Sequence, residues 1–223
     1  MTAHEEKHSS GRSGEILQVF TRFVAERGYD NTNIGDIAAK LGISKGTVVH
    51  HYGNKDYLLA ALHESYMRRR THEAELIMQR LRTPVDQLAG LMYAFIFYQV
   101  HERAATVAFQ REVAKLADRP SLAEGVRLRS EYMSRVRSIA EAGVQEGQLR
   151  DTDLHTQTLL LFGAAQWAWT WFDPNGEESA EQVGAALVDL VLGSLLVSRD
   201  ELGPLADPHG TIPPVVWGCL TAS

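Results

Sequence analysis

Residues 41–55 read Leu-Gly-Ile-Ser-Lys-Gly-Thr-Val-Val-His-His-Tyr-Gly-Asn-Lys, a pattern typical of the turn and second helix of a helix-turn-helix. Gly42 suits a left-handed residue that ends the preceding helix. Ser44 is placed to cap the next helix, because its hydroxyl can accept a backbone N–H of the first turn. The stretch therefore predicts a short helix that carries polar side chains into a DNA major groove.

Helical patterns surround this stretch on both sides. Apolar residues recur at helical spacing over residues 13–27, and Asn33 is placed to cap a short helix over Ile34–Leu41. Asn54 is placed to cap a further, long helix. No run of residues alternates between apolar and polar as a half-buried strand would. The sequence predicts an all-α fold of about nine helices.

The chain divides into four predicted segments. Residues 1–12 are polar and are predicted to form a disordered arm. Residues 13–60 are predicted to form a three-helix DNA-binding head, and residues 61–200 a helical body for ligand binding and dimerisation. Residues 201–223 contain four of the seven prolines and are predicted to form a tail that is not helical.

Composition limits the possible settings and partners. The single cysteine, Cys219, excludes an internal disulfide and favours a reducing, cytoplasmic setting. No apolar run is long enough to predict a membrane span. Residues 1–72 hold 10 Lys/Arg and 8 Asp/Glu, a balance of +2, whereas residues 73–223 hold 12 and 20, a balance of −8. This asymmetry is expected if the amino-terminal part meets phosphates.

Residues from about 12 to 60 resemble the DNA-binding domain of TetR-family transcriptional regulators. The matching residues are Ile16-Leu17, Phe23, Gly28-Tyr29, Thr32, Asp36-Ile37-Ala38, Leu41-Gly42-Ile43-Ser44, Gly46-Thr47, His51-Tyr52 and Asn54-Lys55-Leu58-Leu59. The resemblance implies a homodimer whose helical bodies bind a small effector. It also implies that the dimer represses transcription at a palindromic double-stranded operator until the effector arrives. Gly35 and Val49 depart from the family, which often has a basic and an aromatic residue there.

A set of polar side chains in the head is predicted to contact DNA. Base contacts are expected from Lys45, Thr47 and either His50 or His51, and phosphate contacts from Lys55 and the capping residues. The alternative for His51 is a structural role beside Tyr52. The predicted DNA-binding residues are Asn33, Ser44, Lys45, Thr47, His50, His51, Tyr52 and Lys55.

Aromatic residues crowd the middle of the chain and indicate an apolar effector pocket with few polar groups. The predicted lining residues are Tyr93, Phe97, His101, Phe109, Met133, Trp167 and Trp171. Ordinary core packing is the alternative for each of them. The arrangement Trp171-Phe172-x-Pro-x-Gly resembles a family branch that senses acyl-CoA esters, and Arg127, Arg129, Arg135 and Arg137 are candidates for its phosphates. A neutral aromatic or lipophilic effector fits equally well.

A helix predicted over residues 154–172 carries bulky residues on two faces, so it is expected to lie between its own core and another surface. The family resemblance implies that the last two helices pair with their copies in a second subunit. The predicted dimer residues are Phe162, Gln166, Trp169, Leu187, Leu190, Val191 and Leu195. Helix packing inside one subunit is the alternative.

The sequence offers little support for catalysis, and an all-helical enzyme is the third and weakest alternative. It lacks a His-Glu-x-x-His pair, a Gly-x-Ser-x-Gly elbow and a Gly-rich loop with Gly-Lys-Ser/Thr. We therefore expect no catalytic residues, no metal site and no cofactor. The main alternative to a regulator is a helical ligand-binding or adaptor protein without operator binding, suggested by the departures at Gly35 and Val49.

Overall fold

The fold is entirely helical over the part of the chain that the computed structural model describes, residues 3–113 and 120–222. Eleven α-helices occur in these ranges. The extended pairing found in the same ranges is an isolated antiparallel bridge between Leu149 and Leu196. The predicted all-α class is therefore confirmed, with eleven helices where the sequence predicts about nine.

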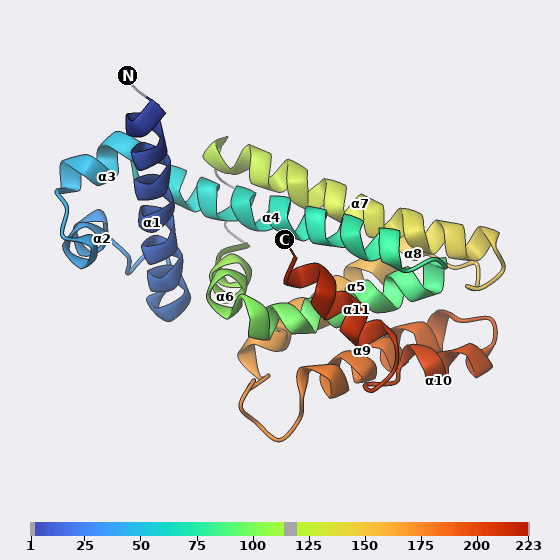
Figure 1. Ribbon diagram of the computed structural model, residues 1–223. Coiled ribbons are helices and arrows are strands. Elements are labelled where there is room, and N and C mark those ends of the chain that lie inside the picture. Colours follow the sequence, from blue (N-terminus) through green and yellow to red (C-terminus); the bar gives the residue numbers. More distant parts are fainter. Residues whose placement is uncertain (1–2, 114–119, 223) are drawn as a thin grey trace. The chain divides into compact units, whose positions relative to one another are not determined.

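The first four helices follow the order predicted around the helix-turn-helix (Figure 1). They are α1 (Ala3–Arg27), α2 (Ile34–Leu41), α3 (Lys45–Tyr52) and α4 (Lys55–Arg80). In contrast to the predicted disordered arm, residues 3–12 form the first turns of α1, while residues 1 and 2 lie outside the described residues. No proline interrupts these turns, so a helix that Ile16, Phe20 and Val24 anchor in the core continues toward the amino terminus.

Seven more α-helices and several short 3-10 turns follow. They are α5 (Pro84–His101), α6 (Arg103–Glu112), η2 (Pro120–Leu122), α7 (Ala123–Gln145), α8 (Leu154–Gln166), η3 (Trp167–Thr170), α9 (Ala180–Leu195), η4 (Arg199–Glu201), α10 (Leu202–Leu205) and α11 (Ile212–Leu220). Local signals explain where several begin. Thr83 caps α5 with Pro84 in the first turn, and Ser179 forms a capping box with Gln182 at α9.

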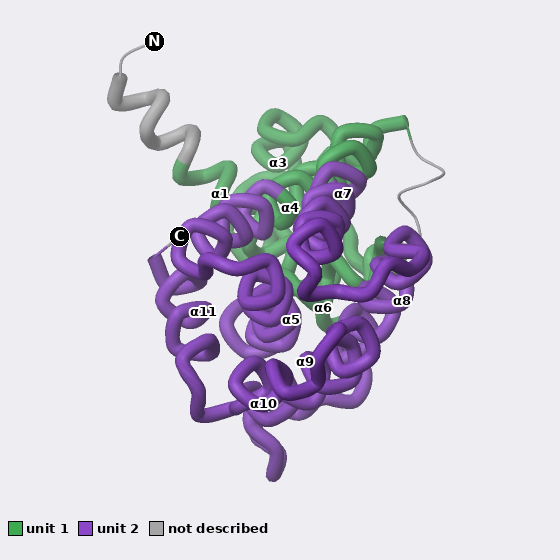
Figure 2. The backbone as a smooth tube through the Cα atoms, turned by 90° about the vertical axis from the view of Figure 1, so that its right-hand side faces the viewer, with its two compact units in different colours: residues 1–67, 104–128 green, residues 68–103, 129–223 purple. Residues whose placement is uncertain are grey.

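The chain contains two compact units (Figure 2). Unit 1 comprises residues 1–67 and 104–128, and unit 2 comprises residues 68–103 and 129–223. These ranges differ from the predicted head, 13–60, and body, 61–200. One reason is that α4 continues without a break past residue 60, so no linker separates the two parts there.

The other reason is that α6 packs within unit 1. The buried carboxylate of Glu112 accepts the backbone N–H of Tyr29 at 2.9 Å, and Arg111 donates to the Ala25 carbonyl at 3.0 Å. The ring of Phe109 stacks on Tyr66 at 4.3 Å between centroids. A buried carboxylate is tolerated only where donors satisfy it, so Glu112 ties α6 to the turn that follows α1.

Unit 2 is organised around α5, on which α8, α9 and α11 pack. A side chain at Gly184 of α9 would overlap the ring of Tyr93, so glycine lets α9 approach α5 closely. Arg70 of α4 is buried and pairs with Glu73 at 2.9 Å and with Glu102 at 2.6 Å. These charges compensate one another in a place that water does not reach freely.

The carboxyl-terminal segment is helical, which corrects the predicted non-helical tail. Pro213 and Pro214 lie in the first turn of α11, where the N–H groups that proline lacks have no partner inside the helix. The side chain of Trp217 stacks on Phe97 at 4.3 Å and 10°, and its indole donates to Glu181 at 2.8 Å. The segment is therefore part of the core of unit 2.

Replacing Trp217 by Ala should lower the free energy of unfolding by about 2–3 kcal/mol, because it removes a stacked aromatic pair and a hydrogen bond. Urea denaturation at fixed protein concentration measures the change. The control is Pro214→Ala, at an exposed position in the first turn of the same helix. Equal stability of the two variants would contradict the role assigned to α11.

Candidate DNA interface and effector cavity

The residues around α3 adopt the capped geometry that the sequence predicts. Gly42 has φ of 65° and ends α2, and the Ser44 side chain accepts the Thr47 N–H at 3.0 Å. The Asn33 side chain accepts the Asp36 N–H at 2.9 Å, and Asn54 accepts the N–H groups of the first turn of α4. Each helix of the motif therefore begins at a residue that satisfies its first amides.

The outward side of α3 carries polar groups. Val48 is the one fully buried residue of this helix, which leaves Lys45 and His50 exposed and Thr47 and His51 half-buried. The rings of His50 and His51 lie 5.6 Å apart, edge to face. The structure thus brings four of the predicted DNA-binding residues together on one short helix.

Two other predicted DNA contacts are engaged inside unit 1. The Tyr52 hydroxyl donates to the Ser13 carbonyl at 2.9 Å and lies 2.9 Å from the Ser13 hydroxyl. The Lys55 ammonium donates to the Tyr29 carbonyl at 3.1 Å and lies 4.1 Å from the centre of the Tyr29 ring. These bonds fix the carboxyl end of α3 and the start of α4, and contact of either residue with DNA stays a prediction.

None of the residues predicted to line an effector pocket lines the cavity that the structure shows in unit 2. Tyr93 and Phe97 are buried in the packing of α5, and His101 is exposed. Phe109 belongs to unit 1, where it packs on His63 and Tyr66. Met133 is half-buried on α7.

Trp167 and Trp171 are 65% and 57% exposed, so their predicted place in a pocket is not what the structure shows. The reason is that α8 ends at Gln166 and the backbone continues as the 3-10 helix η3. The predicted faces assume one continuous α-helix through residue 172, and the change of helix type moves the tryptophans to the surface.

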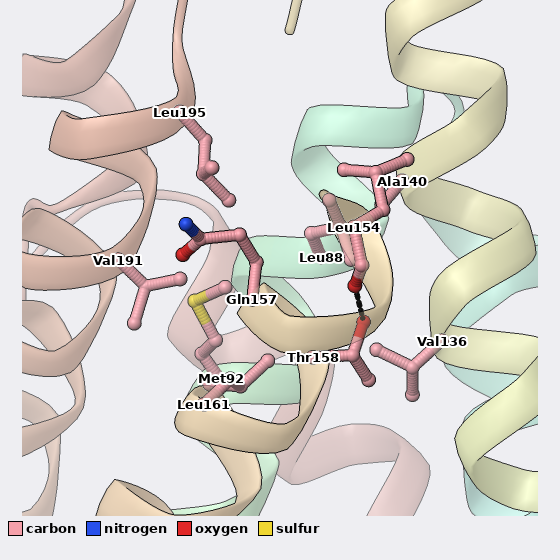
Figure 3. Close-up of a pocket in the computed structure, with 10 residues that line it drawn as sticks. All are labelled: Leu88, Met92, Val136, Ala140, Leu154, Gln157, Thr158, Leu161, Val191 and Leu195. Atoms are coloured by element: carbon pink, nitrogen blue, oxygen red, sulfur yellow. Dashed lines mark hydrogen bonds between the residues drawn. The ribbon is translucent and has the colours of Figure 1, made fainter. Parts of the chain in front are cut away.

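A small cavity does lie inside unit 2, between α5, α7, α8 and α9 (Figure 3). Its lining is aliphatic except for Gln157 and Thr158, and the Thr158 hydroxyl donates to the Leu154 carbonyl at 2.7 Å. The Gln157 amide extends from α8 toward Val191 and Leu195 of α9. The lining residues are Leu88, Met92, Val136, Ala140, Leu154, Gln157, Thr158, Leu161, Val191 and Leu195.

The cavity is about 20 Å³, roughly the space of one water-sized group. No ionisable side chain lines it, so it suits an aliphatic group, and any larger ligand must push its walls apart. The sequence prediction missed it because it followed aromatic residues. The usable signal was the helical spacing of Leu154 and Leu161, with Thr158 between them on the same face of α8.

The arginines considered for a phosphate-bearing effector differ in their partners. Arg127 pairs with Glu124 at 2.7 Å, Arg135 with Glu75 at 3.1 Å and Arg137 with Glu141 at 3.5 Å. Arg129 makes no ion pair with any described residue, and burial lowers the pKa of its guanidinium. Seven residues separate Arg129 from Val136, which places both on one face of α7 about 10 Å apart.

Large apolar side chains are exposed on α8, η3 and α9. They include Leu160 (62%), Trp167 (65%) and Leu190 (67%). Of the residues predicted for the dimer, Leu190 is exposed, and Gln166, Trp169 and Val191 are half-buried. Phe162, Leu187 and Leu195 are instead buried within unit 2, since Phe162 packs on Phe95 at 5.3 Å. Exposed large apolar side chains are common in protein contact surfaces.

The described residues offer no group of three His, Cys, Asp or Glu side chains arranged to hold a metal ion. Over the same ranges, no helix has both the length and the hydropathy to cross a membrane.

A capped helix-turn-helix with a polar recognition helix, joined to a helical unit with an apolar cavity, defines a DNA-binding transcriptional regulator. Comparison with known families agrees. Residues 16–62 match the family described as "Bacterial regulatory proteins, tetR family", and residues 81–195 match "Tetracyclin repressor-like, C-terminal domain". The chain belongs to the TetR family of transcriptional regulators.

Similar proteins cover nearly the whole chain. The HTH-type transcriptional repressor KstR2 of Mycolicibacterium smegmatis is 27% identical over 194 residues, which are 86% of this chain and 94% of the relative. The structure of ketosteroid transcriptional regulator KstR2 of Mycobacterium tuberculosis has a TM-score of 0.75 at 26% identity and covers 84% of this chain and 96% of that one. AibR in complex with isovaleryl coenzyme A and operator DNA has a TM-score of 0.70 at 25% identity, covering 81% and 98%.

Replacing Tyr52 by Phe should reduce stability by about 1 kcal/mol, because the Ser13 carbonyl loses its donor. Affinity for operator DNA should fall several-fold, since the end of α3 is then less firmly held. Thermal denaturation and fluorescence anisotropy measure the two effects. Tyr57→Phe is the control, because Tyr57 is 56% exposed. Indistinguishable variants would show that the bond to Ser13 does not position α3.

Proposed function

We propose that this protein represses transcription as a homodimer that binds a palindromic operator and leaves it when an acyl-CoA ester binds unit 2. The observation that carries the proposal is the pairing of an intact, fully capped recognition helix with an aliphatic cavity in the same chain. The relatives named above are regulators, which supports a regulatory and not a catalytic role. Because the proposed operator is cellular DNA, the proposal also places the protein in the cytoplasm.

The operator part of the proposal rests on α3. Its exposed polar groups can meet base edges in the major groove. Lys55 and the capping residues Asn33 and Ser44 can meet phosphates. The alternative of an adaptor protein without operator binding is less well supported, because Lys45 and His50 on the outward side of α3 are polar and exposed. Gly35 and Val49 leave the capped geometry intact.

The effector part rests on the separation of two environments in unit 2. The cavity takes an aliphatic group, and Arg129 offers a positive charge two turns from Val136 on the same face of α7. An acyl-CoA ester has both an apolar end and anionic phosphates. The complex of AibR with isovaleryl coenzyme A supports this class of ligand in a protein of similar fold.

The dimer part rests on the exposed apolar side chains of α8, η3 and α9. Two recognition helices that read a palindrome must lie about one duplex turn apart, near 34–36 Å, and a stable dimer sets that spacing. An effector can change it only if it binds the two states with different affinity.

The experiment is a gel shift with the protein's own upstream DNA, repeated with isovaleryl, octanoyl and oleoyl coenzyme A and with free coenzyme A. We expect sequence-specific retardation that weakens with salt, and at least tenfold weaker binding with one ester but not with free coenzyme A. Absence of specific retardation at low salt would refute the operator role. Equal affinity with every ester would refute the effector class.

Leu190→Glu should convert the dimer to a monomer at micromolar concentration, because it buries a charge in an apolar interface. Size-exclusion chromatography with light scattering measures the mass. Val126→Glu, at a 42% exposed position on α7, is the matched control and should remain dimeric. A dimeric Leu190→Glu variant would place the subunit contact elsewhere.

Arg129→Gln should raise about tenfold the concentration of the effective ester that releases half of the DNA, with operator affinity unchanged in its absence. Arg137→Gln is the control, because Arg137 pairs with Glu141 and lies at the surface. Anisotropy titrations with a labelled operator give both values. If the two variants release half of the DNA at the same ester concentration, Arg129 is not part of the effector site.

A further inference from the structure

The side chain of Lys45 lies beside the outward face of α3 and not on it. At about 100° per residue, Lys45 is only about 60° from the buried Val48 around the helix, whereas His50 is about 160° from it. Thr47 and Val49 flank His50 at about 100° from Val48 on either side. The face opposite the core is therefore formed by Thr47, Val49 and His50.

Lys45 extends instead over Gly35 of α2. A Cβ atom placed on Gly35 would come within 2.8 Å of Lys45 Cε and 3.2 Å of Lys45 Nζ. Gly35 has no positive φ that would require glycine. What its missing side chain provides is space, and the end of Lys45 fills that space.

The charge of Lys45 is available to an external partner. Asp36, the acidic residue next to Gly35, pairs with Arg27 at 2.7 Å. Lys45 is exposed and makes no ion pair within the described residues. A lone ammonium at the flank of the recognition helix is therefore free to meet an anion.

The position of this charge decides what it meets on DNA. In a helix-turn-helix, the outward face of the second helix contacts base edges, while the first helix crosses the sugar-phosphate backbone. A cation held against α2 meets the backbone, and such contacts set position and affinity without reading sequence.

We propose that Lys45 contacts a phosphate instead of the base edge that the sequence predicts, and that Gly35 makes room for it. Discrimination between bases then rests on Thr47, Val49 and His50, with the exposed Val49 (46%) suited to a thymine methyl group. This inference rests on the operator binding proposed above.

The test uses the full-length protein and measures operator affinity by anisotropy at several salt concentrations, for the operator and a panel of single-base-pair substitutions. Lys45→Ala should weaken binding to every duplex by the same factor, about tenfold, and lower the slope of log affinity against log salt by about 1. His50→Ala should instead flatten discrimination at particular base pairs by about tenfold or more.

The double variant Gly35→Lys with Lys45→Ala provides the decisive arm. It returns a charge to the same place from α2, so we expect it to restore the salt slope and most of the affinity. Gly35→Ala alone should weaken binding, because the added Cβ would come within 2.8 Å of Lys45 Cε. It would also come within 3.0 Å of the Asn33 Oδ1 that caps α2, so thermal denaturation of this variant is measured alongside its affinity.

Loss of discrimination at one G·C pair in Lys45→Ala, with an unchanged salt slope and no rescue by the double variant, would overturn the proposal. Failure of the operator role is a separate result, because the wild-type protein would then bind no duplex sequence-specifically. With wild-type binding intact, the variants test the role of Lys45 alone.

Discussion

The recognition helix α3 fully buries a single side chain, Val48, and the DNA interface depends on this constraint. A helix of eight residues with so little core contact cannot hold its own position, since most helical stability comes from packing. Its placement is imposed at its ends by the Ser44 cap and by the Tyr52 bond to Ser13 of α1. Because α3 contributes so little to the core, its other side chains can be polar and exposed, as DNA contacts require.

In unit 2, in contrast to α3, the central helix α5 is buried on nearly every side. Large rings such as Tyr93 and Phe97 are buried against α9 and α11 and do not line the cavity. The free space is left where smaller aliphatic side chains of α5, α7, α8 and α9 meet. Trp167 and Trp171 are exposed and are suited to contact a second subunit.

Features governed by local chemistry were predictable from the sequence. The caps Asn33, Ser44 and Asn54 form as expected, because each depends on a few neighbouring residues. Features that depend on tertiary context were not. The prolines of α11 fit a helix because they lie in its first turn, and the tryptophans face outward because α8 becomes a 3-10 helix. The side chain of Lys45 lies over Gly35, ten residues earlier in the chain and on a different helix. Helical periodicity relates only residues of one helix, so it could not predict this contact.

The most direct measurement of the central claim is guanine methylation protection on the protein's own upstream DNA, which reports which major-groove edges the bound dimer covers. Two copies of α3 in successive major grooves should give two protected windows on one face of the duplex, with centres about 10–10.5 base pairs apart or a multiple of this. Protection in a single window, or no major-groove protection under conditions of specific binding, would contradict the assignment of α3 as the element that reads DNA.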